Sequence, residues 1–172
     1  MKNLDCSFVT SAVDVRAFDP TDLSAMQALR RAAFEPVFRS FRDIVGPEIA
    51  ACAFAGADAE QAKLLDDICA TQSTHHVRVA VHGGSVVGFV SFSVDVATRV
   101  GEVGLTAVHP DVAGRGIGTR MVEEVLREMK ALGAVVATVG TGGDPSHAPA
   151  RRAYEKAGVG SAIPSVYLYK AL

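Results

Sequence analysis

The feature that most constrains the fold is a succession of strand, glycine-rich turn, amphipathic helix and apolar strand between residues 100 and 139. A helical pattern begins at Ile117 and is ended by Gly133. Its apolar side consists of Ile117, Met121, Val122, Val125, Leu126, Met129 and Leu132. The continuous apolar run Ala134–Val139 then predicts a strand buried on both faces and parallel to the strand before the helix.

The remaining strand patterns predict a mixed sheet. Three of them follow one another closely and predict an antiparallel meander, the first two joined through His82–Ser85. Besides Ala134–Val139, the expected strands are Val13–Phe18, Val77–Val81, Val86–Val94, Val100–Val108 and a last strand at Val166–Tyr169. No internal repeat is present, so we expect a single domain over residues 1–172, with helices packed on the sheet.

Three further helical segments are expected. Asp19 and Pro20 offer a cap for a helix that runs to about Phe34. Residues 35–67 contain two prolines and two glycines, so the pattern is weak until Gln61–Cys69, which again resembles a helix. A short helix at about Pro149–Ala157 is stopped by Gly158.

Composition excludes several classes of protein. The chain has 172 residues, of which 49% are hydrophobic and 21% charged, as in a folded globular domain. A net charge of −2 gives no basic surface for nucleic acid. Three cysteines without a CxxC pair, no signal-peptide pattern and no apolar run near 20 residues predict a cytoplasmic protein that does not enter a membrane.

The turn Ala113–Thr119 is the segment with the clearest chemical capacity. Glycines allow close approach to the backbone, and a helix N-terminus presents unpaired N–H groups that suit a pyrophosphate. A tight turn without a ligand is the alternative. No lysine follows a glycine pair as a P-loop requires, and the glycines come too late in the chain for a dinucleotide fingerprint.

In this context, Ala113–Gly118 resembles the signature Gln/Arg-x-x-Gly-x-Gly/Ala of the GNAT superfamily of acyl-CoA-dependent N-acetyltransferases. A second motif of that family, Asn-x-x-Ala-x-x-x-Tyr, is matched by His147–Tyr154. Ala113 and His147 depart from the residues usual at their positions. The resemblance implies an α+β fold: a mostly antiparallel sheet of six to seven strands, about four helices, and two splayed parallel strands that bind acetyl-CoA.

The resemblance also implies site residues. Thr106, Ala107 and Val108 would pair their backbone with pantetheine, through a bulge that Gly101 and Gly104 would tolerate. The expected cofactor-binding residues further along the chain are Ala113, Gly114, Arg115, Gly116, Ile117, Gly118, Thr119, His147, Ala150 and Arg151.

Two residues are expected to act in catalysis. Tyr154 holds the position of the family's general acid, with a core aromatic as the alternative. Glu102 matches the strand glutamate that deprotonates the amine, often through water, and strand alternation would place it on one face with Thr106 and Val108. An ordinary ion pair involving Asp95 and Arg99 is the alternative for Glu102.

The resemblance therefore predicts transfer of an acetyl group from acetyl-CoA to a primary amine of a small molecule or peptide, by direct attack in a ternary complex. An acidic excess in residues 35–67 hints at a cationic acceptor, although an ordinary solvated helix face would look the same. A catalytically weak acyl-CoA sensor is the competing function. No metal is expected, and the protein could form a homodimer.

Overall fold

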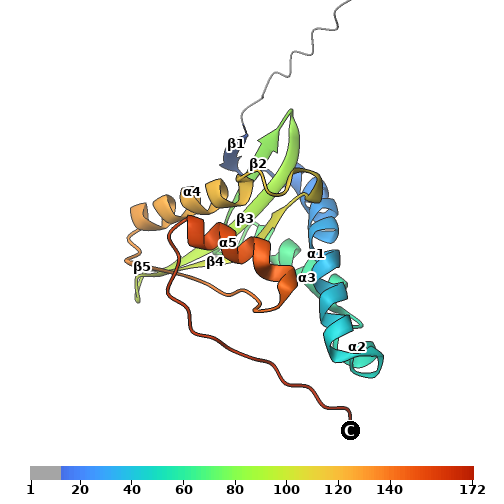
Figure 1. Ribbon diagram of the computed structural model, residues 1–172. Coiled ribbons are helices and arrows are strands. Elements are labelled where there is room, and N and C mark those ends of the chain that lie inside the picture. Colours follow the sequence, from blue (N-terminus) through green and yellow to red (C-terminus); the bar gives the residue numbers. More distant parts are fainter. Residues whose placement is uncertain (1–12) are drawn as a thin grey trace, which may run out of the picture.

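The computed structural model describes residues 13–172. Five strands form one sheet in the order β1-β2-β3-β4-β5, antiparallel except for the parallel pair β4 and β5 (Figure 1). The strands are β1 (Asp14–Ala17), β2 (His76–His82), β3 (Ser85–Asp95), β4 (Val100–Val108) and β5 (Val136–Val139). The helices are α1 (Leu23–Val45), α2 (Pro47–Ala53), α3 (Ala57–Cys69), α4 (Ile117–Ala131) and α5 (Ala148–Lys156).

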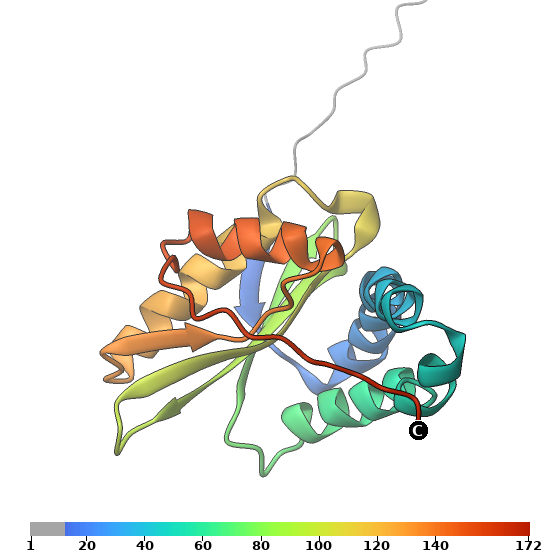
Figure 2. The same ribbon diagram turned by 60° about the horizontal axis from the view of Figure 1, so that its bottom comes forward.

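Helices cover both faces of the sheet, as the two sides of Figure 2 show. On one face, α4 and α5 enclose a core that includes Phe92, Val103 and Met121. On the other, α1 and α3 enclose a second core that includes Met26 and Phe89. The amphipathic pattern of α4 is confirmed: its buried residues are Ile117, Met121, Val122, Val125 and Met129.

The predicted helix from Leu23 to Phe34 continues to Val45, through Pro36. An internal proline costs a helix about 3 kcal/mol, but tertiary burial of the following turn offsets that cost. Phe38 is buried, and its ring lies 6.2 Å from that of Phe34. The weakly patterned region that follows is also helical, as α2 and α3, so residues 13–172 form five α-helices.

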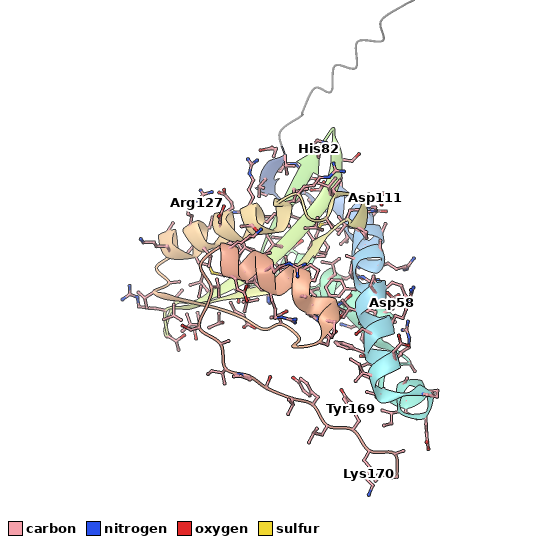
Figure 3. All side chains as sticks on the ribbon, viewed as in Figure 1. Asp58, His82, Asp111, Arg127, Tyr169 and Lys170 are labelled. Carbon is pink, nitrogen blue, oxygen red and sulfur yellow. The ribbon has the colours of Figure 1, made fainter. Side chains whose placement is uncertain are left out.

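The expected last strand at Val166–Tyr169 is wrong, and the described sheet has five strands rather than six to seven. After Val159, whose N–H bonds to Tyr154, the chain runs as an extended exposed segment toward the α2 end of the molecule (Figure 2). Tyr169, labelled in Figure 3, packs there with its ring 5.8 Å from that of Phe54. Pro164 has no N–H for a sheet ladder, and the aromatic contact leads the segment away from β5.

The prediction that Ala134–Val139 is buried on both faces is also wrong. Ala137 and Val139 pack against the α4 core, but Val136 is 52% exposed. The described core between the sheet and helices α1 and α3 includes no residue of β5. β5 is therefore an edge strand with one solvent-exposed face.

Candidate functional site

A bulge in β4 shapes the site. Val90 pairs with Thr106, whereas Phe92 pairs with Val103, so Gly104 and Leu105 together oppose the single residue Ser91 of β3. A side chain at Gly104 would place its Cβ 2.6 Å from Ser91 Oγ. Glycine at position 104 therefore lets the bulge form without displacing the Ser91 side chain.

Beyond the bulge, β4 loses its second neighbour. The parallel pairing with β5 covers only Val100–Val103 and Val136–Val139. The N–H of His109 donates to Val87 O at 2.8 Å, so alternate residues of β4 turn their backbone toward β3. It follows that Thr106 and Val108 present N–H and C=O groups to the open edge, and the splay between parallel strands predicted from the resemblance is present.

Ala107 does not join these two residues at the open edge. By the same alternation its backbone faces β3, and its methyl group is buried in the core formed by α1 and α3. Two of the three predicted pantetheine-contacting residues are thus brought to the open edge.

The turn before α4 holds a row of unused donors. Gly114 and Gly116 adopt φ of 77° and 81°, the left-handed region that favours glycine. Within residues 13–172, the amides of residues 114–119 donate to no protein acceptor, and the first amide of the helix to do so is that of Arg120, which bonds to Gly116 O. The turn is exposed over residues 113–116, so these amides can meet an anion.

Ala113 and Arg115 differ from the rest of the turn. The amide of Ala113 already bonds to Pro110 O at 3.1 Å. The guanidinium of Arg115 folds back and donates to the backbone oxygen of Asp111 at 3.3 Å; Asp111 is labelled in Figure 3. Arg115 remains exposed, so its charge stays next to the free amides.

Helix α5 places Tyr154 beside the open edge of β4. The side chain is only 7% exposed and packs in the core formed by α4 and α5, so the aromatic serves packing as well. Burial raises the pKa of the Tyr154 hydroxyl above its usual value, and the hydroxyl of Thr106 beside it partly offsets this effect. Tyr154 therefore keeps its proton at neutral pH and can donate it.

Glu102 lies at the point where β4 and β5 part, paired with Thr138, one residue before the last pair. It does not share a face with Thr106 and Val108, and that prediction is wrong. Gly101 faces α4, since a Cβ there would lie 2.6 Å from Met129 Sδ, so Glu102 points to the opposite face. The extra residue of the bulge reverses the alternation before Thr106 is reached.

The alternative of a surface ion pair for Glu102 finds no support in the described residues, where Glu102 forms no ion pair. Asp95 accepts hydrogen bonds from the amides of Ala97 and Thr98. Arg99 donates to the backbone oxygen of Gly133. Glu102 is exposed and its carboxylate is free.

A polar cluster that the sequence did not indicate lies at the start of α5. Asp144 Oδ1 accepts a 2.6 Å hydrogen bond from His147 Nδ1, and Oδ2 accepts from the Ser146 amide and, at 3.0 Å, from the Ser40 hydroxyl of α1. Burial alone would raise the pKa of the Asp144 carboxyl, but the hydrogen bonds from Ser146, His147 and Ser40 outweigh burial and lower it to about 2. Asp144 is therefore ionised.

Aromatic and basic side chains complete this cluster. The ring of His147 stacks on that of Phe41 with centroids 5.6 Å apart. Arg151 donates to the backbone oxygens of Gly142 and Asp144. Arg151 thus holds the loop, and only the second ring nitrogen of His147 is left for a ligand. The partners on α1 lie more than 100 residues away and could not have been found in the sequence.

A shallow hollow of about 410 Å³ lies next to this cluster, between α1 and Pro145. Arg39, Ser40 and Asp43 line it. The acidic excess of residues 35–67 does not concentrate there, because Glu35 pairs with Arg39 and Arg42 and Asp58 pairs with Arg30.

Two negative findings concern residues 13–172. No three His, Cys, Asp or Glu side chains gather as a metal site would require. None of the helices is both long and apolar enough to cross a membrane.

The fold and the site define a class: a mixed α/β domain with an open sheet edge beside a row of free amides, which suits an extended ligand ending in phosphate. The model of the acetyltransferase (GNAT) family matches residues 38–159, and the chain belongs to this family. The predicted family and the prediction of an acetyltransferase are thereby confirmed. No curated protein sequence matches the chain.

Solved structures show the same fold at low identity. A GNAT family acetyltransferase from Brucella melitensis in complex with acetyl-CoA is 22% identical over 77% of this chain and 79% of its own, with a TM-score of 0.58. A ribosomal-protein-alanine N-acetyltransferase from Brucella melitensis biovar Abortus 2308 is 19% identical over 93% and 99%, with a TM-score of 0.60. An aminoglycoside N-acetyltransferase in complex with CoA is 17% identical over 94% and 97%, with a TM-score of 0.63.

Proposed function

We propose that the protein transfers the acetyl group of acetyl-CoA to a primary amine of a small molecule or peptide, by direct attack in a ternary complex. The observation that supports this most is the row of free amides at residues 114–119 beside the open edge of β4. Membership of the GNAT family makes acetyl-CoA the co-substrate that fits such a site. A related structure has acetyl-CoA bound, in agreement with this assignment.

The main chain supplies binding and electrostatic stabilisation. Amides of residues 114–119 would hold the coenzyme diphosphate, with the charge of Arg115 nearby. Thr106 and Val108 would pair with the pantetheine arm along the open edge, and the N–H of Val108 would polarise the thioester carbonyl. Ala150 and Arg151 of α5 would border the arm on its other side.

Two side chains move protons in this proposal. Tyr154 donates its hydroxyl proton to the departing thiolate, since burial keeps that hydroxyl protonated. Glu102, free and exposed where the strands part, accepts a proton from the incoming ammonium group through water. An acyl-CoA sensor without turnover is not favoured, because a protonated tyrosine stands beside the open edge.

The proposed acceptor is a primary amine. Related structures carry the names of an aminoglycoside N-acetyltransferase and a ribosomal-protein-alanine N-acetyltransferase, both of which indicate amine acceptors. The hollow between α1 and Pro145 adjoins the site and could receive part of such an acceptor. Kanamycin, spermidine and a peptide with N-terminal alanine therefore form a suitable first panel.

The proposal is tested by titrating the protein calorimetrically with acetyl-CoA and then measuring thiol release with the panel. We expect Tyr154→Phe to lower kcat by about ten- to a thousandfold while the Kd for acetyl-CoA stays unchanged. Tyr167→Phe, at a tyrosine that is 85% exposed, is the matched control and should behave as wild type. Absence of acetyl-CoA binding at millimolar concentration would refute the proposal.

A further inference from the structure

The pair Asp144 and His147 lies at one end of α5, and the proposed function does not use it as a proton-transfer device. The two side chains are 12% and 17% exposed, so the pair is largely shielded from water. A side chain at Gly142 would place its Cβ 2.5 Å from His147 Nδ1 and 2.6 Å from Asp144 Oδ1. The backbone therefore approaches the pair closely on one side, while Phe41 covers the imidazole ring.

The hydrogen bond fixes which nitrogen of His147 is free. Asp144 is an ionised carboxylate, which can only accept, so Nδ1 must donate its proton to Oδ1. In the neutral ring Nε2 then carries no proton and is an acceptor. Nε2 has no hydrogen-bond partner among residues 13–172, and it is not one of their buried unpartnered atoms.

His147 and Tyr154 occupy two positions along α5. His147 precedes Tyr154 by seven residues, or two turns, so both lie on one side of α5 about 10 Å apart. Tyr154 is beside Thr106 at the open edge of β4, and His147 is at the end of α5 that contacts α1. The hollow lined by Ser40 and Pro145 adjoins the His147 end.

We propose that His147 is a second catalytic residue, whose Nε2 accepts a proton from the amine nitrogen during acyl transfer and whose ring is held in the required tautomer by Asp144. This inference rests on the proposed function. It assigns His147 to proton transfer, beyond the coenzyme contact that the family motif implies.

The number of protons lost by the amine requires a second proton acceptor, which is His147 in this proposal. A primary ammonium group must lose two protons to become an amide N–H. The first leaves through water to Glu102, which yields the neutral amine. The amine nitrogen then forms a bond to the thioester carbon and passes its second proton to His147 Nε2. The carbon–sulfur bond breaks and the thiolate takes the Tyr154 proton. Exchange with solvent then removes the protons gained by Glu102 and His147 and returns one to Tyr154.

Charged and polar groups surround His147 on α5 and α1. Asp144 faces Nδ1, and Arg151 on the same helix lies over the backbone oxygen of Asp144 at 2.9 Å. From α1, Ser40 and Phe41 contact the pair, and the charged residues of α1 beside them are Arg39 and Asp43 in the adjoining hollow.

The test compares His147→Asn with wild type and with His75→Asn, a control at an exposed histidine just before β2. The asparagine amide can still donate to Asp144, so the fold is kept while the proton acceptor is lost. We expect His147→Asn to lower kcat about a hundredfold or more, to leave the Kd for acetyl-CoA within twofold, and to change the pH profile of kcat/KM. Added imidazole should restore part of the rate.

A second measurement does not depend on turnover. The ¹⁵N NMR shifts of His147 should show the tautomer protonated at Nδ1, and Asp144→Ala, which removes the acceptor of that proton, should weaken this preference and lower kcat with the ring still present. A ring protonated at Nε2, or an active wild type whose kcat is unchanged in His147→Asn, would overturn the inference. A wild type that binds no acetyl-CoA would instead refute the proposed function, which is a separate result.

Discussion

The bulge in β4 rests on the contact between Gly104 and Ser91, so replacing Gly104 by alanine should destabilise the protein. The added Cβ would lie 2.6 Å from Ser91 Oγ, far inside van der Waals contact, so the fully buried Ser91 side chain or the backbone would have to shift. Overpacking of this kind costs about 1–3 kcal/mol. Because the bulge directs Thr106 and Val108 to the open edge, Gly104→Ala should also weaken acetyl-CoA binding.

A double-mutant cycle isolates this contact. Ser91→Ala removes the hydroxyl, whose own hydrogen bond to Leu105 O is long at 3.5 Å, so it should cost only about 0.5–1 kcal/mol. In the double variant the new methyl group of residue 104 no longer meets an oxygen. Its stability should therefore approach that of Ser91→Ala alone, a coupling of about 1–2 kcal/mol.

Urea denaturation at neutral pH measures the four stabilities, with m-values that should agree. Gly160→Ala is the control, since a Cβ there meets nothing within 4 Å, and it should change stability by less than about 0.5 kcal/mol. Strictly additive effects of Gly104→Ala and Ser91→Ala would show that the close approach does not determine the bulge.

Three further outcomes follow from the site. Gly116→Asp should raise the Kd for acetyl-CoA at least about tenfold in calorimetry. Gly133→Asp, at a glycine with similar φ at the other end of α4, is the control and should not raise it. Equal Kd values for the two variants would contradict the anion-binding turn. Glu102→Gln should change the pH profile of kcat/KM at unchanged acetyl-CoA affinity, and an identical profile would leave solvent as the first proton acceptor. The pKa of Asp144 is about 2 in the folded protein, below its value near 3.8 in the unfolded chain. Wild type should therefore exceed Asp144→Asn in stability by roughly 2 kcal/mol above pH 4 and lose this advantage as the pH falls toward 2. A stability difference that stays constant in urea titrations from pH 6 to 2 would refute this prediction.

The sequence predicted what depends on local pattern. The periodicity of α4, the three antiparallel strands and the glycine-rich turn were all found, because each is encoded within a few neighbouring residues. The length of α1 was not, since burial of Phe38 by tertiary packing overrides the local signal of Pro36. The last strand failed for the same reason, because its apolar residues pack elsewhere or stay exposed.

In the site, too, local motifs were predicted from the sequence and contacts between distant segments were not. Candidates read from motifs, such as Tyr154 and the turn at residues 114–119, lie where a ligand could meet them. The faces of β4 were mispredicted because strict alternation over nine residues ignores one inserted residue, and Gly104 beside Ser91 is a contact between strands. The hydrogen bond from Ser40 to Asp144 joins segments 104 residues apart, and only the folded chain shows it.

The bulge and the polar cluster have related consequences for chemistry. By reversing the alternation of β4, the bulge places Glu102 on one face of the sheet and Thr106, beside Tyr154, on the other. In the proposed mechanism, the amine that attacks the thioester would lose its first proton to Glu102 and its second to His147, whose ring stacks on Phe41 of α1. One extra residue in β4 thus separates the proposed proton acceptor Glu102 from the proposed proton donor Tyr154 across the sheet.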